Sequence, residues 1–132
     1  MGVRVLIVED DPVVLQLLEW RLAASLGYTV CGKAMTAEDA FSEVKTRQPE
    51  VILMDIHLDG RMDGIDAAHA IKKMYNLPVI FLTGHFADDE IERAKAVRPD
   101  GYILKPFTDT DLRVALELAC GSPGSGPTDP TG

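Results

Sequence analysis

Residues 51–55, Val-Ile-Leu-Met-Asp, hold the pattern that decides the fold: an unbroken apolar run that leads directly into an acid. Such a run, without alternation of apolar and polar side chains, is typical of a strand buried on both faces of a parallel sheet. Similar short runs rich in β-branched residues recur along the chain at regular intervals. The predicted strands are residues 3–8, 28–34, 51–54, 78–82 and 102–104.

Helical periodicity fills most of the segments between these strands. Residues 12–26 are predicted to form a helix, because Pro12 suits a first turn, apolar residues recur at helical spacing and Gly27 provides a stop. Thr36-Ala-Glu-Asp39 is similar to a capping box and predicts a second helix that ends before Pro49. The remaining predicted helices are about 65–75, 88–97 and one that starts around residue 108. This alternation predicts a doubly wound α/β domain with a parallel sheet.

The composition limits the class of protein and of partner. The chain has 132 residues, 46% of them hydrophobic, which is enough for one buried core. Its 13 basic and 21 acidic side chains give a formal net charge of −8, which disfavours direct binding to nucleic acid or to an anionic membrane. Cys31 and Cys120 are far apart and predict buried free thiols rather than a disulfide or a zinc site. Without an export signal or membrane anchor, the expected location is the cytoplasm.

The end of the chain differs from the rest. Residues 121–132, GSPGSGPTDPTG, contain only Gly, Ser, Pro, Thr and Asp. They cannot contribute to a core and are therefore predicted to be disordered. We expect one domain over residues 1–120, followed by a tail or a linker, and this tail is compatible with a stand-alone protein or with a fragment of a longer one.

Acids follow the first and third predicted strands. Glu9-Asp10-Asp11 comes directly after the first strand, and Asp55 directly after the third. Because the carboxyl ends of parallel strands meet at one edge of a doubly wound sheet, we expect these carboxylates to lie close together. Crowded carboxylates either raise their pKa values or recruit a cation, and an all-oxygen group suits Mg²⁺. The alternative is that residues 9–11 only cap the first helix.

A hydroxyl and an ammonium group stand at the ends of the last two strands. Thr83 follows the fourth strand, and Lys105 follows the fifth. With a divalent ion and Lys105 to offset charge, Asp55 could attack phosphorus and form an acyl phosphate, to which Thr83 would donate a hydrogen bond. Taken singly, Thr83 is an ordinary strand-end residue and Lys105 an ordinary surface charge. The prediction depends on several strand ends supplying compatible groups.

Motifs at these strand ends occur in a fixed order. They are Val-Glu-Asp-Asp at 8–11, Leu-Met-Asp-Ile-His-Leu at 53–58, Leu-Thr-Gly at 82–84 and Tyr-Ile-Leu-Lys-Pro-Phe at 102–107. Together they resemble the receiver domain of response regulators, over roughly residues 3–120. The resemblance implies a flavodoxin-like fold, with strands in the order 2-1-3-4-5 and five flanking helices. It implies a phosphoacceptor of a two-component phosphorelay, not an enzyme beyond self-catalysed phosphoryl transfer and autodephosphorylation.

The resemblance also implies a role for each matching residue. Asp55 matches the phosphoacceptor, Asp10 a direct Mg²⁺ ligand and Glu9 an acid that reaches the ion through water. His57 matches the position whose backbone carbonyl binds the metal. The other matches are Thr83 to the switch hydroxyl, Lys105 to the phosphoryl-binding lysine, Pro106 to the site of a cis peptide and Tyr102 to the aromatic switch. Tyr102 alternatively reads as an ordinary half-buried strand aromatic.

The implied partners follow from the same resemblance. A sensor histidine kinase or a histidine phosphotransfer protein would donate the phosphoryl group, and an unidentified output partner would receive the signal. Phosphorylation is expected to turn the Tyr102 ring inward as Thr83 moves toward the phosphate, which reshapes the surface of the fourth helix, fifth strand and fifth helix. A homodimer formed on phosphorylation is a further expectation.

The loop after Asp55 departs from the family pattern. Many receivers have a proline before Met-Asp-Gly, whereas residues 56–64, Ile-His-Leu-Asp-Gly-Arg-Met-Asp-Gly, lack it and are one residue longer. Asp59-Gly60 predicts a tight turn instead. His57 and His85 flank the expected site, and we hypothesise that they alter the lifetime of the acyl phosphate. A transition-metal site formed by these histidines and Asp59 is the alternative.

Other classes of function stay open from the sequence. A pseudo-receiver would keep the fold as a protein-interaction scaffold without phosphoryl transfer, which the complete set of acids, threonine and lysine argues against. A metal-dependent phosphatase with an aspartyl nucleophile needs a second Asp two residues after the nucleophile, and this chain has His57 there.

Overall fold

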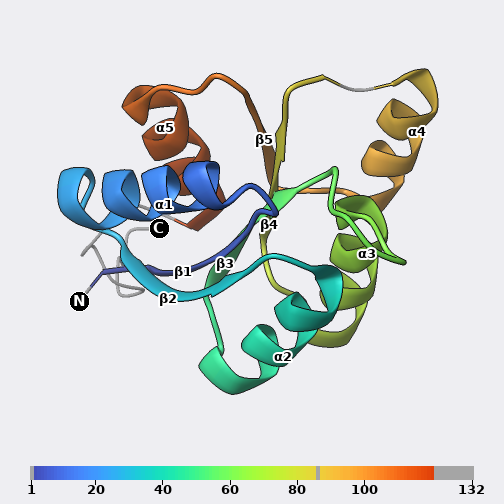
Figure 1. Cartoon of the computed structure of the whole chain (residues 1–132), viewed down its shortest axis with the longest axis horizontal. Coiled ribbons are helices and arrows are strands. Elements are labelled where there is room, and N and C mark those ends of the chain that lie inside the picture. Colours follow the sequence, from blue (N-terminus) through green and yellow to red (C-terminus); the bar gives the residue numbers. More distant parts are fainter. Residues whose placement is uncertain (1, 86, 121–132) are drawn as a thin grey trace, which may run out of the picture.

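A parallel sheet of five strands lies between two layers of helices (Figure 1). The computed structural model describes residues 2–85 and 87–120. The strands are β1 (Arg4–Val8), β2 (Thr29–Ala34), β3 (Val51–Asp55), β4 (Val79–Thr83) and β5 (Gly101–Leu104). Their order in the sheet is β2-β1-β3-β4-β5. The predicted fold class and strand order are therefore confirmed.

The helices cover both faces of this sheet. They are α1 (Pro12–Trp20), α2 (Ala37–Arg47), α3 (Gly64–Tyr75), α4 (Asp88–Val97) and α5 (Asp109–Cys120). Helices α1 and α5 lie on one face, and α2, α3 and α4 lie on the other (Figure 1). None of the helices in the described residues is long and apolar enough to cross a membrane.

The central strands form the core because both of their faces are covered. Every residue of β3 and β4 is buried. Successive side chains of a strand point to opposite faces, so one apolar run supplies two cores. Leu6, Ile52 and Phe81 pack in the core on the α2–α4 side, while Leu53 and Ile80 pack in the core on the α1–α5 side.

The first helix differs from the prediction of one regular helix over residues 12–26. Helix α1 ends at Trp20, and the chain continues as a π-helical turn, η1 (Arg21–Ser25). The wide turn is closed by the Leu26 N–H, which donates to the Arg21 carbonyl at 3.0 Å. Apolar periodicity reports the buried face of a helix but not its hydrogen-bond register, so a π turn escapes prediction.

The predictions for the thiols and the tail have different outcomes. Cys31 and Cys120 are free, as expected, but both are only partly buried, so the prediction of buried thiols was wrong. Cys31 lies on β2, an edge strand that the sheet and α2 cover incompletely. The predicted disorder of residues 121–132 concerns a segment that lies outside the described residues.

Candidate functional site

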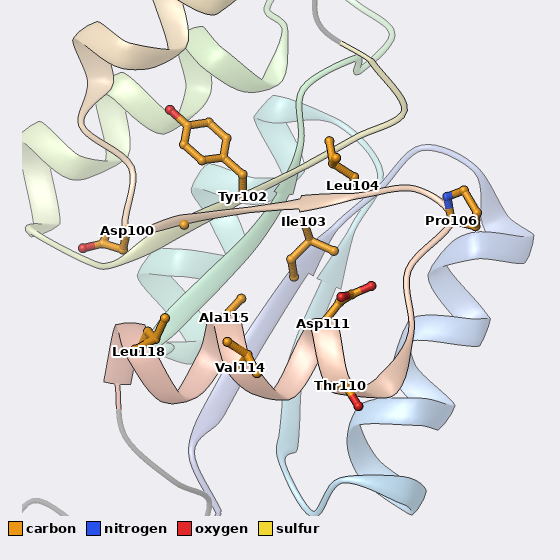
Figure 2. A pocket seen from close by; sticks show the side chains of 11 residues that line it. Asp100, Tyr102, Ile103, Leu104, Pro106, Thr110, Asp111, Val114, Ala115 and Leu118 are labelled. Atoms are coloured by element: carbon orange, nitrogen blue, oxygen red, sulfur yellow. The ribbon is translucent and has the colours of Figure 1, made fainter.

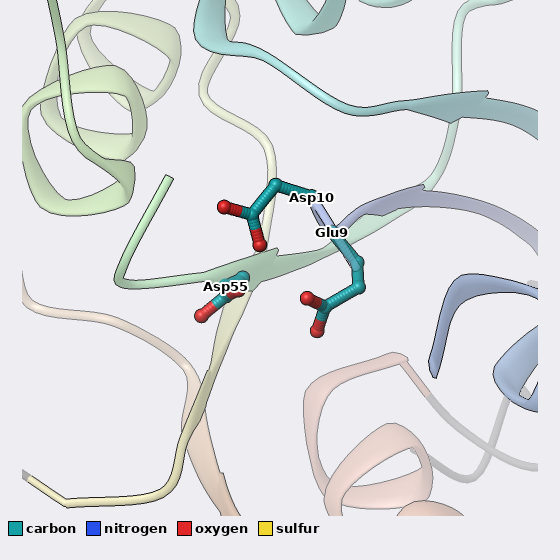
Figure 3. A group of neighbouring side chains, drawn as sticks. All are labelled: Glu9, Asp10 and Asp55. Atoms are coloured by element: carbon teal, nitrogen blue, oxygen red, sulfur yellow. The ribbon is translucent and has the colours of Figure 1, made fainter. Parts of the chain in front are cut away.

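Glu9, Asp10 and Asp55 gather at the carboxyl ends of β1 and β3 (Figure 3). These strands pair in parallel with Val8 opposite Met54, so the residues that follow come side by side. Carboxylate oxygens of the three residues lie within 4.8 Å of one another. Glu9 and Asp55 are buried, with 1% and 3% of their surface exposed, and Asp10 is half-buried. The predicted meeting of acids is therefore present.

Asp11 does not join this group. Its carboxylate accepts a hydrogen bond from the Val13 N–H at 2.9 Å and caps α1. Helix capping was the alternative considered for all the acids after β1, and it applies to Asp11. The Asp11 N–H in turn donates to Glu9 Oε2 at 3.1 Å, which helps to hold the Glu9 side chain in place.

Lys105 brings a positive charge to the acids. Its Nζ lies 2.9 Å from Glu9 Oε1 and 3.6 Å from Asp55 Oδ2. The Lys105 N–H donates to the Thr83 carbonyl at 2.8 Å, and the following peptide bond, to Pro106, is cis as expected. Burial acts to lower the pKa of Lys105, but the hydrogen bond to Glu9 and the charge of Asp55 outweigh it, so the pKa is raised. Lys105 is charged and faces both buried acids.

The environment of Asp55 raises its pKa to about 7. Burial is the largest cause, followed by hydrogen bonding to Glu9 and the charge of Glu9. The His57 N–H, which donates to Asp55 Oδ1 at 3.1 Å, and the Lys105 charge lower the pKa and only partly compensate. Two buried acids thus share one lysine, and a further cation would be stabilised here.

The donor set fits a magnesium ion. All the groups that converge are carboxylate oxygens, which are the ligands that Mg²⁺ prefers, and the partial exposure of Asp10 leaves access for the water ligands that this ion retains. The histidine alternative lacks this support, because the acidic group is the only metal-ligating cluster found in residues 2–85 and 87–120.

Thr83 lies at the end of β4, fully buried. Its hydroxyl donates to the His85 carbonyl at 2.6 Å and accepts from the His85 N–H at 3.2 Å. Thr83 therefore lies at the expected edge of the sheet, but its hydroxyl is engaged in a local turn.

Tyr102 is the predicted site residue that lies apart from the acids. Its side chain is 45% exposed, on β5, the edge strand of the sheet. Its ring centroid is 6.2 Å from that of the buried Phe81. Figure 2 shows Tyr102 and Leu104 on one side of β5 and Ile103 on the side that faces α5. All three, with residues of α5, line a groove of about 520 Å³.

Gly64 lets α3 begin directly against the end of β3 at Asp55. A Cβ at this position would overlap the Asp55 carbonyl oxygen and crowd Ile56. The Gly64 N–H donates to the Ile56 carbonyl at 2.8 Å. The close approach requires glycine at this position, although sequence reasoning assigned it no role.

Sequence reasoning also missed residues that hold the site from outside. Arg21, Glu90 and Arg93 contact the connections that carry Lys105 and Asp55. No local motif marks them, because each contact joins segments more than 25 residues apart. The only feature that could have pointed to Glu90 and Arg93 was the helical spacing of charges in α4. That spacing is equally typical of a helix face exposed to solvent.

Comparisons with known proteins agree with this geometry. The family model of the response regulator receiver domain matches residues 5–117. The transcriptional regulatory protein PdtaR of Mycobacterium tuberculosis is 35% identical over 116 residues, which cover 88% of this chain and 56% of PdtaR. The response regulator protein VraR of Staphylococcus saprophyticus is 32% identical over 117 residues, which cover 88% of this chain and 56% of VraR. The chain thus spans about half the length of these curated relatives.

Solved structures share the fold, and one of them also shares about a third of its sequence. The signal receiver domain of a modulated diguanylate cyclase from Desulfovibrio desulfuricans G20 has a TM-score of 0.84 and 34% identity, over 90% of this chain and 93% of that one. The chemotaxis protein CheY4 of Vibrio cholerae has a TM-score of 0.81 at 24% identity, over 90% and 99%, and shows the fold alone. On the family match, the curated relatives and the shared fold, the chain belongs to the receiver domain family of response regulators, in two-component signalling.

Proposed function

We propose that Asp55 accepts a phosphoryl group from a phosphohistidine donor in the presence of Mg²⁺. The observation that carries the proposal is the convergence of three carboxylates within 4.8 Å, with Lys105 Nζ 3.6 Å from Asp55 Oδ2. A nucleophilic carboxylate and a cation close beside it are the groups that acyl phosphate formation needs. The domain would extend over residues 1–120.

In the proposed transfer, an ionised Asp55 oxygen attacks phosphorus. An O–P bond forms as the P–N bond to the donor imidazole breaks, and the imidazole nitrogen keeps the electron pair and takes a proton from water. Asp10, Asp55 and the His57 carbonyl would hold the ion, with Glu9 reaching it through water. The ion would neutralise charge on the phosphoryl oxygens and lower the pKa of Asp55 below the value of about 7 set by burial.

Lys105 and Thr83 would then hold the product. Lys105 would move its hydrogen bonds from Glu9 toward a phosphoryl oxygen. The Thr83 hydroxyl would exchange its 2.6 Å hydrogen bond to the His85 carbonyl for one to the phosphoryl group. This movement of Thr83 would leave space near Phe81 for the Tyr102 ring. The α4-β5-α5 surface would then shift toward the second of its two conformations.

The proposed partners act at different stages. A sensor histidine kinase or a histidine phosphotransfer protein would supply the phosphoryl group in the cytoplasm. An output partner, or a second copy of the chain, would bind the switched surface. The formal charge of −8 argues against direct binding to nucleic acid.

Intact mass spectrometry tests the proposal. The protein is incubated with Mg²⁺ and acetyl phosphate, and one added phosphoryl group is expected on the wild type and none on Asp55→Asn. Absence of a mass shift in the wild type would instead favour a pseudo-receiver scaffold. Rapid turnover of a phosphomonoester would favour a phosphatase. Omission of Mg²⁺ serves as the control for the ion, and it should prevent the mass shift.

A further inference from the structure

Helix α4 contacts both ends of the loop formed by residues 57–63, which borders Asp55. Glu90 in its first turn contacts His57 at the start of the loop, and Arg93, about one turn later, contacts Asp63 at its end. The loop contains Gly60, which has a φ of 113°. A single rigid helix therefore spans the loop.

The Glu90 carboxylate joins two segments. Its Oε2 lies 2.9 Å from His57 Nε2, and its Oε1 accepts the Ala87 N–H at 2.9 Å. The Glu90 side chain is only 15% exposed. The pKa of Glu90 is lowered, first by the Ala87 N–H and also by the His57 hydrogen bond, so Glu90 is an anion that holds the start of α4 to His57.

The Arg93 guanidinium forms the second contact. Its Nη1 lies 3.0 Å from Asp63 Oδ2, and its Nη2 lies 2.9 Å from Asp66 Oδ1 and donates to Asp63 Oδ1 at 3.1 Å. Asp63 also accepts the Asp66 N–H at 2.9 Å and caps α3. Burial acts to raise the pKa of Asp63, but the hydrogen bonds from Arg93 and from the Asp66 N–H lower it overall. A fork that binds a carboxylate through both nitrogens is strong and directional.

Both contacts lead directly to Asp55. The His57 N–H donates to Asp55 Oδ1 at 3.1 Å. At the other end, Gly64 follows Asp63, donates to the Ile56 carbonyl and packs against the Asp55 carbonyl without space for a side chain. A shift at either end of the loop therefore moves the Asp55 backbone or its hydrogen-bond donor.

We propose that Glu90 and Arg93 are positioning residues that set the conformation of the 57–63 loop and, through it, the rates at which Asp55 gains and loses a phosphoryl group. The part about rates rests on the proposed function. Because both contacts of α4 hold the loop, a partner that displaces α4 would also alter the lifetime of the acyl phosphate. Coupling between binding free energies is reciprocal, so phosphorylation would change the affinity of such a partner.

Hydrogen exchange without a phosphodonor tests the structural part. The reporters are the hydrogen-bonded amides of His57, Gly64 and Asp66 in Glu90→Gln and Arg93→Gln. Glu92→Gln is the matched control, because Glu92 lies on the same helix, is 78% exposed and contacts only Lys95 among the described ion pairs. Exchange about fivefold faster is expected at His57 in the Glu90 variant and at Gly64 and Asp66 in the Arg93 variant. Rates equal to those of the control would overturn the proposal.

Phosphoryl kinetics test the functional part. The rate of phosphoryl loss after removal of acetyl phosphate is expected to change about three- to tenfold in Glu90→Gln and Arg93→Gln and to stay unchanged in Glu92→Gln. Arg93→Lys keeps the positive charge but cannot bind a carboxylate through two nitrogens. Its rate of phosphoryl loss is expected to lie between those of the wild type and Arg93→Gln. If amide hydrogens exchange faster in a variant but its rate of phosphoryl loss is unchanged, the proposed coupling between the loop and Asp55 is refuted. If the wild type takes no phosphoryl group, the proposed function and the coupling are both refuted. Hydrogen exchange would still test whether Glu90 and Arg93 hold the 57–63 loop.

Discussion

The Lys105 ammonium lies 2.9 Å from the Glu9 carboxylate, so residues from opposite ends of the chain form a partly buried ion pair. Asp55 lies beside this pair and shares the same lysine at 3.6 Å. Burial is the main reason that the pKa of Asp55 rises to about 7, and the hydrogen bond and charge of Glu9, which one lysine only partly offsets, add to the rise. A second cation is therefore expected to stabilise the site, and the free energy of unfolding should depend on pH and on Mg²⁺.

Asp55→Asn is expected to stabilise the protein at about pH 8 without Mg²⁺ and to have little effect near pH 4. The pKa of Asp55 is about 7 when folded, against 3.8 for an ordinary Asp. Between these values the folded state binds more protons than the unfolded chain, so stability is lost as the pH rises through about 7. Asparagine carries no charge and avoids this loss, a gain of about 1–3 kcal/mol.

Urea unfolding across this pH range measures the effect. Asp59→Asn, in the exposed part of the loop, is the control and should change stability by less than about 0.5 kcal/mol. Addition of Mg²⁺ should stabilise the wild type more than Asp55→Asn. An equal gain at every pH would contradict the stated origin of the effect.

Gly64→Ala is expected to cost about 2–4 kcal/mol, because its Cβ would overlap the Asp55 carbonyl oxygen, a backbone atom that cannot turn aside. Phosphoryl uptake should fall as well, since Asp55 or α3 must shift. Gly84→Ala is the control for stability, because no atom lies within 4 Å of a Cβ there. Equal unfolding midpoints for the two variants would show that the close contact relaxes without cost.

Arg21→Gln is expected to slow phosphoryl uptake by loosening the connection that carries Lys105. Arg21 Nη1 donates to the Phe107 carbonyl at 3.1 Å and its guanidinium lies 5.4 Å from the centre of the Phe107 ring. The expected effect is an acetyl phosphate concentration for half-maximal rate that is about three- to tenfold higher. Arg113→Gln, which removes an exposed pair with Glu117 at 3.9 Å, is the control. An equal rise of this concentration in both variants would show that the loss of one positive charge, and not the contact with Phe107, causes the effect.

His85→Ala and His57→Ala are expected to accelerate phosphoryl loss, on the hypothesis that the two rings, whose centroids are 5.8 Å apart, shield the acyl phosphate from the attacking water. The His85 variant is the cleaner test, since the contact of α4 with the loop uses the His57 ring. His69→Ala, exposed on α3, is the control. Loss rates measured by intact mass that match the control in both variants would refute the role of the rings.

Much of the architecture was predictable from local pattern. The strands predicted at residues 51–54 and 78–82 carry continuous apolar runs, which is typical of strands that helices cover on both faces. The positions of Asp55, Thr83 and Lys105 followed from the rule that ligand-binding residues stand at the carboxyl ends of parallel strands. The π turn at Arg21–Ser25 was not predictable, because side-chain periodicity tolerates one extra residue in a turn.

The sequence by itself determined which residues enter the core and which chemical groups reach the edge of the sheet, since strand and helix periods assign each side chain a face. Tertiary structure alone decided how those groups are paired: Lys105 with Glu9, Arg93 with Asp63, and Asp11 with its own helix instead of the acidic group. Pairing depends on distances between segments remote in the chain, which no local pattern encodes. For that reason the proposed acceptor could be predicted from the sequence, while the contacts of α4 with the loop beside it became visible only in the fold.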